Sequence, residues 1–140
     1  MPHYLDINFS AVLVASVVGY VIGALWYSSL LFGKSWMSMM NFDEKILEEI
    51  KQKGIGKTYA AAFFNTFIMA LVLSIFVRHP GATHLWVGLL TGFLIWLGFM
   101  VTIHTASALW EGKPTKLFFL NAGHNLVSIL IMSTILSLWP

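Results

Sequence analysis

The sequence predicts an all-α integral membrane protein: a bundle of four transmembrane helices with both termini on the outer side. Hydrophobic residues make up 58% of the 140 residues and charged residues only 10%, whereas about 25% are charged in a typical soluble domain. Four apolar runs are long enough to cross a bilayer, which takes roughly 20 residues. Seven of the eight Lys and Arg residues fall in two loops on one side of these runs. The length indicates a single membrane domain, 1–140.

The four expected spans lie near 9–32, 57–77, 85–108 and 115–138. Each should be a helix, because backbone polar groups in lipid must be satisfied within the segment. The first run is taken as a retained span rather than a signal peptide, since no Lys or Arg precedes it and no A-x-A cleavage site follows it. The four spans therefore account for most of the chain.

The basic residues predict the orientation. The first loop holds five lysines and the third holds Lys113 and Lys116, whereas the second holds only Arg78. The positive-inside rule places the first and third loops in the cytoplasm and both termini outside. We therefore expect a multi-pass protein of the cytoplasmic (inner) membrane.

The first loop contains an expected cytoplasmic amphipathic segment, 41–54. Helical spacing places Phe42, Ile46, Leu47 and Ile50 on one face. Such a helix can lie on the membrane surface, bind a partner, or connect two spans while resting on the bundle. We favour the connecting role, because its charges are mixed rather than strongly basic.

The stretch FFLNAGHNLVSIL, 118–130, carries polar side chains deep in the fourth expected span. At 1.5 Å per residue, polar residues of all four spans fall in the cytoplasmic half of the membrane. Ionisable residues within a span usually face the bundle interior or a water-filled cavity. The candidate ligand-binding or pore-lining residues are Tyr27, Ser28, Asn65, His104, Glu111, Asn121, His124 and Asn125.

Three functional interpretations follow from this shared depth. The candidate residues line a binding site or pathway for a small molecule, a lipid or protons, for which histidine has a suitable pKa. Alternatively, they only hold helices together in a structural or accessory subunit. Least favoured is a metal-dependent membrane enzyme using His104, His124 and Glu111, because no H-E-x-x-H spacing supports it. We expect a non-enzymatic role and identify no catalytic or metal residue and no cofactor.

Other partners are constrained by composition and by two glycine motifs. The chain lacks a basic stripe for nucleic acid, and the lipid bilayer is its expected environment; a protein partner is not indicated. Gly19 with Gly23, and Gly88 with Gly92, form G-x-x-x-G pairs that allow close helix packing, either between protomers or between the first and third spans. The small bundle favours a homo-oligomer.

The chain resembles a family of small bacterial membrane proteins, domain of unknown function 1761. The resemblance rests on GALWYSSLLFGKSWM (23–37), GLLTGFLIWLGFM (88–100) and EGKPTKLFFLNAGHNLVSILIMSTILSLW (111–139). Ser29 stands where the family pattern W-Y-S-P has a helix-ending proline, so the end of the first span departs from that pattern. The resemblance implies four spans and supplies no activity, substrate or catalytic residue.

Overall fold

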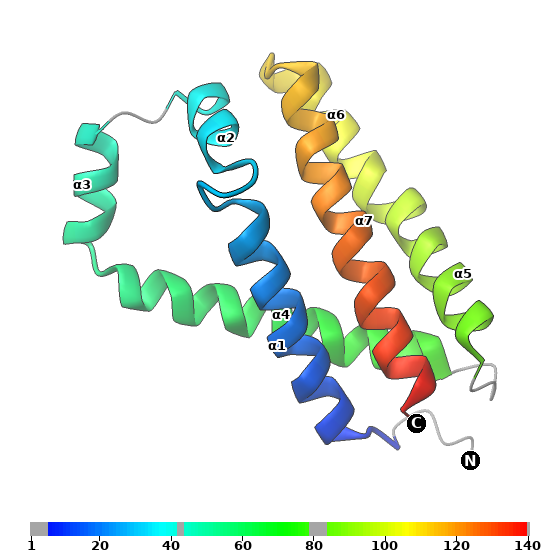
Figure 1. Cartoon of the computed structure of the whole chain (residues 1–140). Coiled ribbons are helices and arrows are strands. Elements are labelled where there is room, and N and C mark those ends of the chain that lie inside the picture. Colours follow the sequence, from blue (N-terminus) through cyan, green and yellow to red (C-terminus); the bar gives the residue numbers. More distant parts are fainter. Residues whose placement is uncertain (1–5, 42–43, 79–83, 140) are drawn as a thin grey trace.

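A computed structural model describes residues 6–41, 44–78 and 84–139, whose regular structure is helical. Figure 1 shows the helices in chain order. They are α1 (Phe9–Trp26), α2 (Gly33–Met39), α3 (Glu44–Gln52), α4 (Ile55–Arg78), α5 (Leu85–Ile95), the π-helical segment η1 (Trp96–Val101), α6 (Thr102–Glu111) and α7 (Thr115–Leu138).

Four continuous helices are long and apolar enough to cross a membrane, which confirms the predicted all-α architecture of four membrane helices. They are Phe9–Trp26, Ile55–Val77, Leu85–Glu111 and Thr115–Leu138. The third runs through α5, η1 and α6 without a break. Most of their surface is apolar and uncovered, as expected for helices that face lipid.

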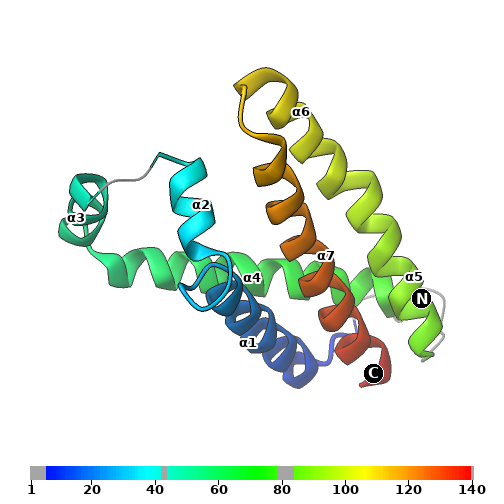
Figure 2. The same cartoon turned by 45° about the horizontal axis from the view of Figure 1, so that its top comes forward.

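Helix α7 is the central element of the bundle and contacts α1, α4 and α5. It lies between α1 and the α5–α6 helix, while α4 crosses these helices steeply (Figures 1 and 2). The core lies where α1, α4 and α7 meet and includes Val12, Leu73, Ile129 and Met132. The start of α1 and the end of α7 lie at the same end of the bundle, where Asn8 Nδ2 donates to the Trp139 carbonyl at 3.4 Å.

The first membrane helix ends at Trp26 rather than near residue 32. Tyr27 and Ser28 therefore lie in the turn after the helix, not inside the span. The Leu25 carbonyl at the helix end accepts both the Ser28 hydroxyl at 2.7 Å and the Ser28 backbone N–H at 3.2 Å, and these two bonds hold the turn. Gly33 permits the turn, because a Cβ there would collide with the backbone of Tyr27 and Ser28. The chain thus ends this helix without the family's proline.

Both G-x-x-x-G pairs pack inside the chain, and their main partner is α7 rather than each other. A Cβ added to Gly92 would lie 2.5 Å from Ser133 Oγ, and one added to Gly88 would meet Ser137. A Cβ on Gly19 would lie 2.7 Å from Met132 Sδ, and one on Gly23 would lie 3.3 Å from His124 Nε2. The glycines therefore set how closely α1 and α5 approach α7.

The expected amphipathic segment contains α3, which ends shortly before Gly54. Gly54 has φ +97°, a left-handed conformation that favours glycine after a helix. Ile46 and Ile50 are half-buried, and α3 contacts α4. Phe42 and the Leu47 side chain, which belong to the predicted apolar face, lie outside the described part of the chain.

Candidate functional site

The predicted polar residues, apart from Asn125, line two cavities on different sides of α7. One cavity opens between α1 and α4, and the other lies between α6 and α7. Residues of α7 reach both, because even side chains three positions apart on a helix point about 60° apart around its axis. His124 faces the α1–α4 cavity, whereas Asn121 lines the α6–α7 cavity. The sequence-predicted group is therefore divided rather than gathered around one centre.

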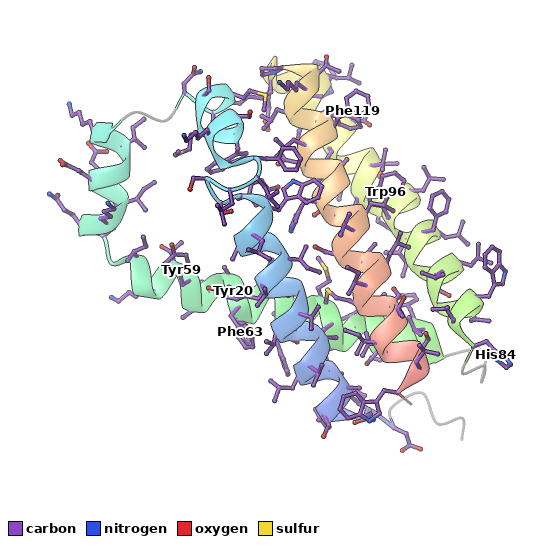
Figure 3. All side chains as sticks on the ribbon, viewed as in Figure 1. Tyr20, Tyr59, Phe63, His84, Trp96 and Phe119 are labelled. Atoms are coloured by element: carbon purple, nitrogen blue, oxygen red, sulfur yellow. The ribbon has the colours of Figure 1, made fainter. Side chains whose placement is uncertain are left out.

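The α1–α4 cavity has a volume of ≈ 620 Å³ and combines aromatic rings with a few polar groups. Figure 3 shows Tyr20, Tyr59 and Phe63 on the α1–α4 side of the protein, away from Trp96 and Phe119. Tyr20 packs edge-on against Phe63, with 5.6 Å between ring centroids. The lining residues include Tyr20, Gly23, Tyr27, Ser28, Trp36, Tyr59, Asn65, Thr66 and His124.

His124 is held in the wall of this cavity by rings and by its own helix. Its ring lies 5.0 Å from that of Tyr27 in an edge-on contact and 6.0 Å from that of Trp26. Its Nε2 is 3.2 Å from the Ser128 hydroxyl. The absence of a side chain at Gly23 lets the imidazole approach α1. These contacts hold the His124 imidazole in one position in the cavity wall.

Asn65 differs from every other predicted residue of this cavity. It lies within the span of α4, its side chain is exposed, and its amide has no hydrogen-bond partner among the described residues. The neighbouring Thr66 hydroxyl donates to the Ala62 carbonyl at 3.0 Å, so it is satisfied within its own helix. The hydroxyls of Tyr20 and Tyr59 likewise lack a partner in the described chain. These free groups give the cavity its unused hydrogen-bonding capacity.

The α6–α7 cavity is smaller, with a volume of ≈ 180 Å³. His104, Ser107 and Glu111 line it from one face of α6, as their spacing predicts, and Asn121 lines it from α7. Lys113, in the short turn between the two helices, completes its outer rim. This cavity therefore extends from half-buried His104 to a charged end at the turn.

Hydrogen bonds across helices connect the walls of the two cavities. Tyr27 Oη donates to Asn121 Oδ1 at 2.8 Å and so links the end of α1 to α7. The Asn125 amide bonds His104 Nε2 and links α7 to α6. Burial raises the pKa of Tyr27, which lies just beyond the α1 span, to about 12, so its hydroxyl keeps its proton at neutral pH. Such bonds contribute about 0.6–2 kcal/mol each in membrane bundles.

Two tryptophans reinforce these links and were not predicted as functional residues. Trp26 Nε1 donates to the Leu120 carbonyl at 3.1 Å, and Trp96 Nε1 donates to the Ala122 carbonyl at 2.8 Å. Both bonds go to α7, whose short side chain at Ala122 leaves the backbone within reach. From the sequence, a tryptophan in the middle of a span is expected only to pack against its neighbours. Hydropathy does not indicate that its indole N–H bonds a backbone carbonyl of another helix.

The π-helical segment η1 begins at Trp96 and ends at Val101, three residues before His104, in the third membrane helix. A π-turn holds one more residue than an α-turn, and it therefore changes which residues further along the helix face a neighbour. Trp96 at the start of the segment and His104 after it both bond α7. This segment thus positions His104 at the α6–α7 cavity.

The structure does not support the metal-site interpretation. His104 and Glu111 line the α6–α7 cavity, whereas His124 lines the α1–α4 cavity. Within the described ranges no group of three His, Cys, Asp or Glu side chains is placed to hold a metal ion. The three residues considered for a zinc-type centre are therefore not convergent.

Some lining residues of the α1–α4 cavity were missed, although the sequence contains their signal. Tyr20, Gly23 and Tyr27 follow i, i+3, i+7 spacing, as do Tyr59, Ala62 and Thr66. Each set therefore shares one helical face. Tyr27 was among the predicted residues, whereas Tyr20 and Tyr59 were not, because tyrosine is common at membrane boundaries and in helix packing.

Comparison with known proteins agrees with this architecture and adds no activity. The chain matches a protein family over residues 10–137, which includes all but the first and last residue of the four membrane helices. No curated protein matches the chain, and no solved structure matches it. The matched region covers nearly the whole sequence, so the chain belongs to the family described as "Protein of unknown function (DUF1761)".

Proposed function

We propose that this membrane protein binds a small molecule or a lipid head group in the α1–α4 cavity. The observation that carries the proposal is the Asn65 amide, which lies in a span, faces the cavity and has no partner in the described chain. Leaving an amide without a hydrogen bond in an apolar medium costs several kcal/mol. A bound polar group would remove this cost.

The size and lining of the cavity support this proposal. Ligand sites usually measure about 300–1,000 Å³ and combine apolar and aromatic walls with a few placed polar groups. The cavity, at ≈ 620 Å³, falls within this range. Its polar groups come from three helices, with Asn65 on α4, Tyr20 on α1 and His124 on α7. A ligand there would contact all three helices at once.

A purely structural role accounts for only part of the polar residues. Tyr27 with Asn121, and His104 with Asn125, bond one another across helices and need no ligand. The same explanation fails for Asn65, because it joins no helices in the described chain. Hydrogen bonding between helices therefore accounts for the paired residues in the walls, whereas binding of a ligand would account for Asn65.

The placement of the site in the cell is part of the proposal. Lysines dominate the loops at the end of the bundle that carries α2, α3 and the α6–α7 turn. The positive-inside rule favours this end as the cytoplasmic side of a bacterial inner membrane. The cavity would then lie in the cytoplasmic half of the bilayer.

Native mass spectrometry of the protein released from nanodiscs tests the proposal. We expect wild-type protein to carry an additional mass that Asn65→Leu abolishes. Thr105→Val is the matched control, because Thr105 is also an exposed polar residue within a span but bonds only its own helix, at the Val101 carbonyl. Folded wild type and Asn65→Leu with the same bound masses would refute the proposal. The spectra also report the number of subunits.

A further inference from the structure

We infer that the ligand of the α1–α4 cavity is a neutral amphipathic molecule whose polar end both donates and accepts hydrogen bonds. This inference rests on the proposed function and adds the chemical class of the ligand. It is carried by the charges of the lining, by the type of its unused hydrogen-bonding groups, and by the exposure of α4 beside the cavity.

The charges of the lining disfavour an ionic ligand. None of the residues that line the cavity is Asp, Glu, Lys or Arg. Lys34 and Lys57, each two positions before a lining aromatic residue, are exposed and do not belong to the lining. A charge moved from water into a site without an opposite charge loses several kcal/mol of solvation that nothing there replaces. Of the lining residues only His124 can become charged near neutral pH. An ammonium group would therefore enter uncompensated, and a phosphate or a carboxylate would be compensated only by a protonated His124, whose charge within a span is itself costly.

The unused polar groups offer both donors and acceptors. An asparagine amide presents two N–H donors and a carbonyl acceptor, and a tyrosine hydroxyl can do either. Asn65, Tyr20 and Tyr59 keep these groups free in the described chain. A hydroxyl or carboxamide on the ligand complements this set, whereas a group that only donates or only accepts would leave part of it unpaired. The lining thus favours an alcohol or an amide at the polar end.

The exposure of α4 indicates where an apolar body would lie. Residues 57–62 of α4 are all exposed, and Phe64, beside Asn65, is 62% exposed. Much of the side-chain surface of this stretch is uncovered in the described chain, so lipid can reach the cavity from the side of α4. A hydrocarbon chain attached to the polar end can therefore remain in lipid while the polar end enters the cavity.

Nanodiscs that contain equal amounts of three dioleoyl lipids test the inference by native mass spectrometry. The lipids are dioleoylglycerol, which is neutral and has a hydroxyl, dioleoyl phosphatidic acid, which is anionic, and dioleoyl trimethylammonium propane, which is cationic. Their acyl chains are the same, so the comparison isolates the head group. The measured quantity is the binding of each lipid to wild type relative to its binding to Asn65→Leu. This comparison corrects for lipid that binds elsewhere on the protein surface.

We expect the Asn65-dependent binding of dioleoylglycerol to exceed that of either charged lipid by at least about tenfold. Thr105→Val should behave as wild type, and Tyr20→Phe should weaken binding less than Asn65→Leu. An Asn65-dependent preference for a charged lipid would overturn the inference and leave the proposed function standing. If the binding of no lipid depends on Asn65, the molecule that copurifies with wild type decides the question. A neutral small molecule upholds the inference, and an ionic one overturns it. If no bound molecule is found, the proposed function itself is refuted.

Discussion

Replacing Gly92 with alanine should separate α5 from α7, because the two backbones approach closely at this point. The added Cβ would lie 2.5 Å from Ser133 Oγ and 3.3 Å from the Ile129 carbonyl oxygen. The first contact can be relieved only if Ser133 moves, and Ser133 is fully buried. Overpacking of this kind costs about 1–3 kcal/mol. We expect Gly92→Ala to lower the free energy of unfolding by that amount, measured by denaturation in mixed micelles.

Two further variants make this prediction specific to the contact. Gly98→Ala is the control in the same membrane helix, because a Cβ there meets nothing within 4 Å and should cost little. Ser133→Gly should restore most of the stability lost in Gly92→Ala, since it removes the side chain that collides. Equal stability of Gly92→Ala and Gly98→Ala would refute the packing described for α5 and α7. A loss that appears only as dissociation of an oligomer would instead assign Gly92 to a contact between protomers.

Three other predictions concern buried and bridging polar groups. Ser133→Ala should raise the free energy of unfolding by up to about 1 kcal/mol, because the Ser133 hydroxyl is buried without a partner in the described chain; lower stability would contradict this. His104→Leu or Asn125→Leu alone should each cost about 1 kcal/mol, and the double variant less than their sum, if the two side chains bond each other. Burial raises the pKa of Tyr27 from 10.0 to about 12, so the folded state holds this proton more tightly than the unfolded state. The resulting stability is present below pH 10 and lost as pH rises towards 12. Over this range the free energy of unfolding of Tyr27→Phe should fall less than that of wild type. Equal decreases in the two proteins would contradict the buried position of Tyr27.

The sequence predicts the membrane helices well, because their length and hydropathy are set by bilayer thickness. The spans near 57–77, 85–108 and 115–138 fall within the helices Ile55–Arg78, Leu85–Glu111 and Thr115–Leu138. The end of α1 is less predictable. Apolar residues continue through Leu30 to Phe32, but the chain leaves the helix at Trp26 because of local bonds at Ser28 and the close approach of Gly33. Hydropathy does not register such bonds.

The arrangement of the candidate site is predicted only in part. Depth along each helix shows that polar residues share one half of the bundle, and the spacing of His104, Ser107 and Glu111 places them on one face. Depth does not show which neighbour each face meets. His124 and Asn125 point about 100° apart, so His124 reaches the α1–α4 cavity while Asn125 bonds His104 on α6. The steep crossing of α4 and the π-helical segment η1 depend on tertiary packing, which hydrophobic periodicity does not encode.

The reactivity of a single cysteine at position 65 tests most directly whether Asn65 faces a polar cavity. The chain contains no cysteine, so Asn65→Cys provides one thiol, and it also removes the amide that a ligand would need. Ile68→Cys is the comparison, because Ile68 is an exposed residue of the same helix that does not line the cavity. In membrane vesicles we expect a water-soluble thiol reagent to label position 65 and to leave position 68 largely unreacted. Equal protection of the two positions would contradict the central claim, since Asn65 would then face lipid or another protein surface instead of an accessible cavity.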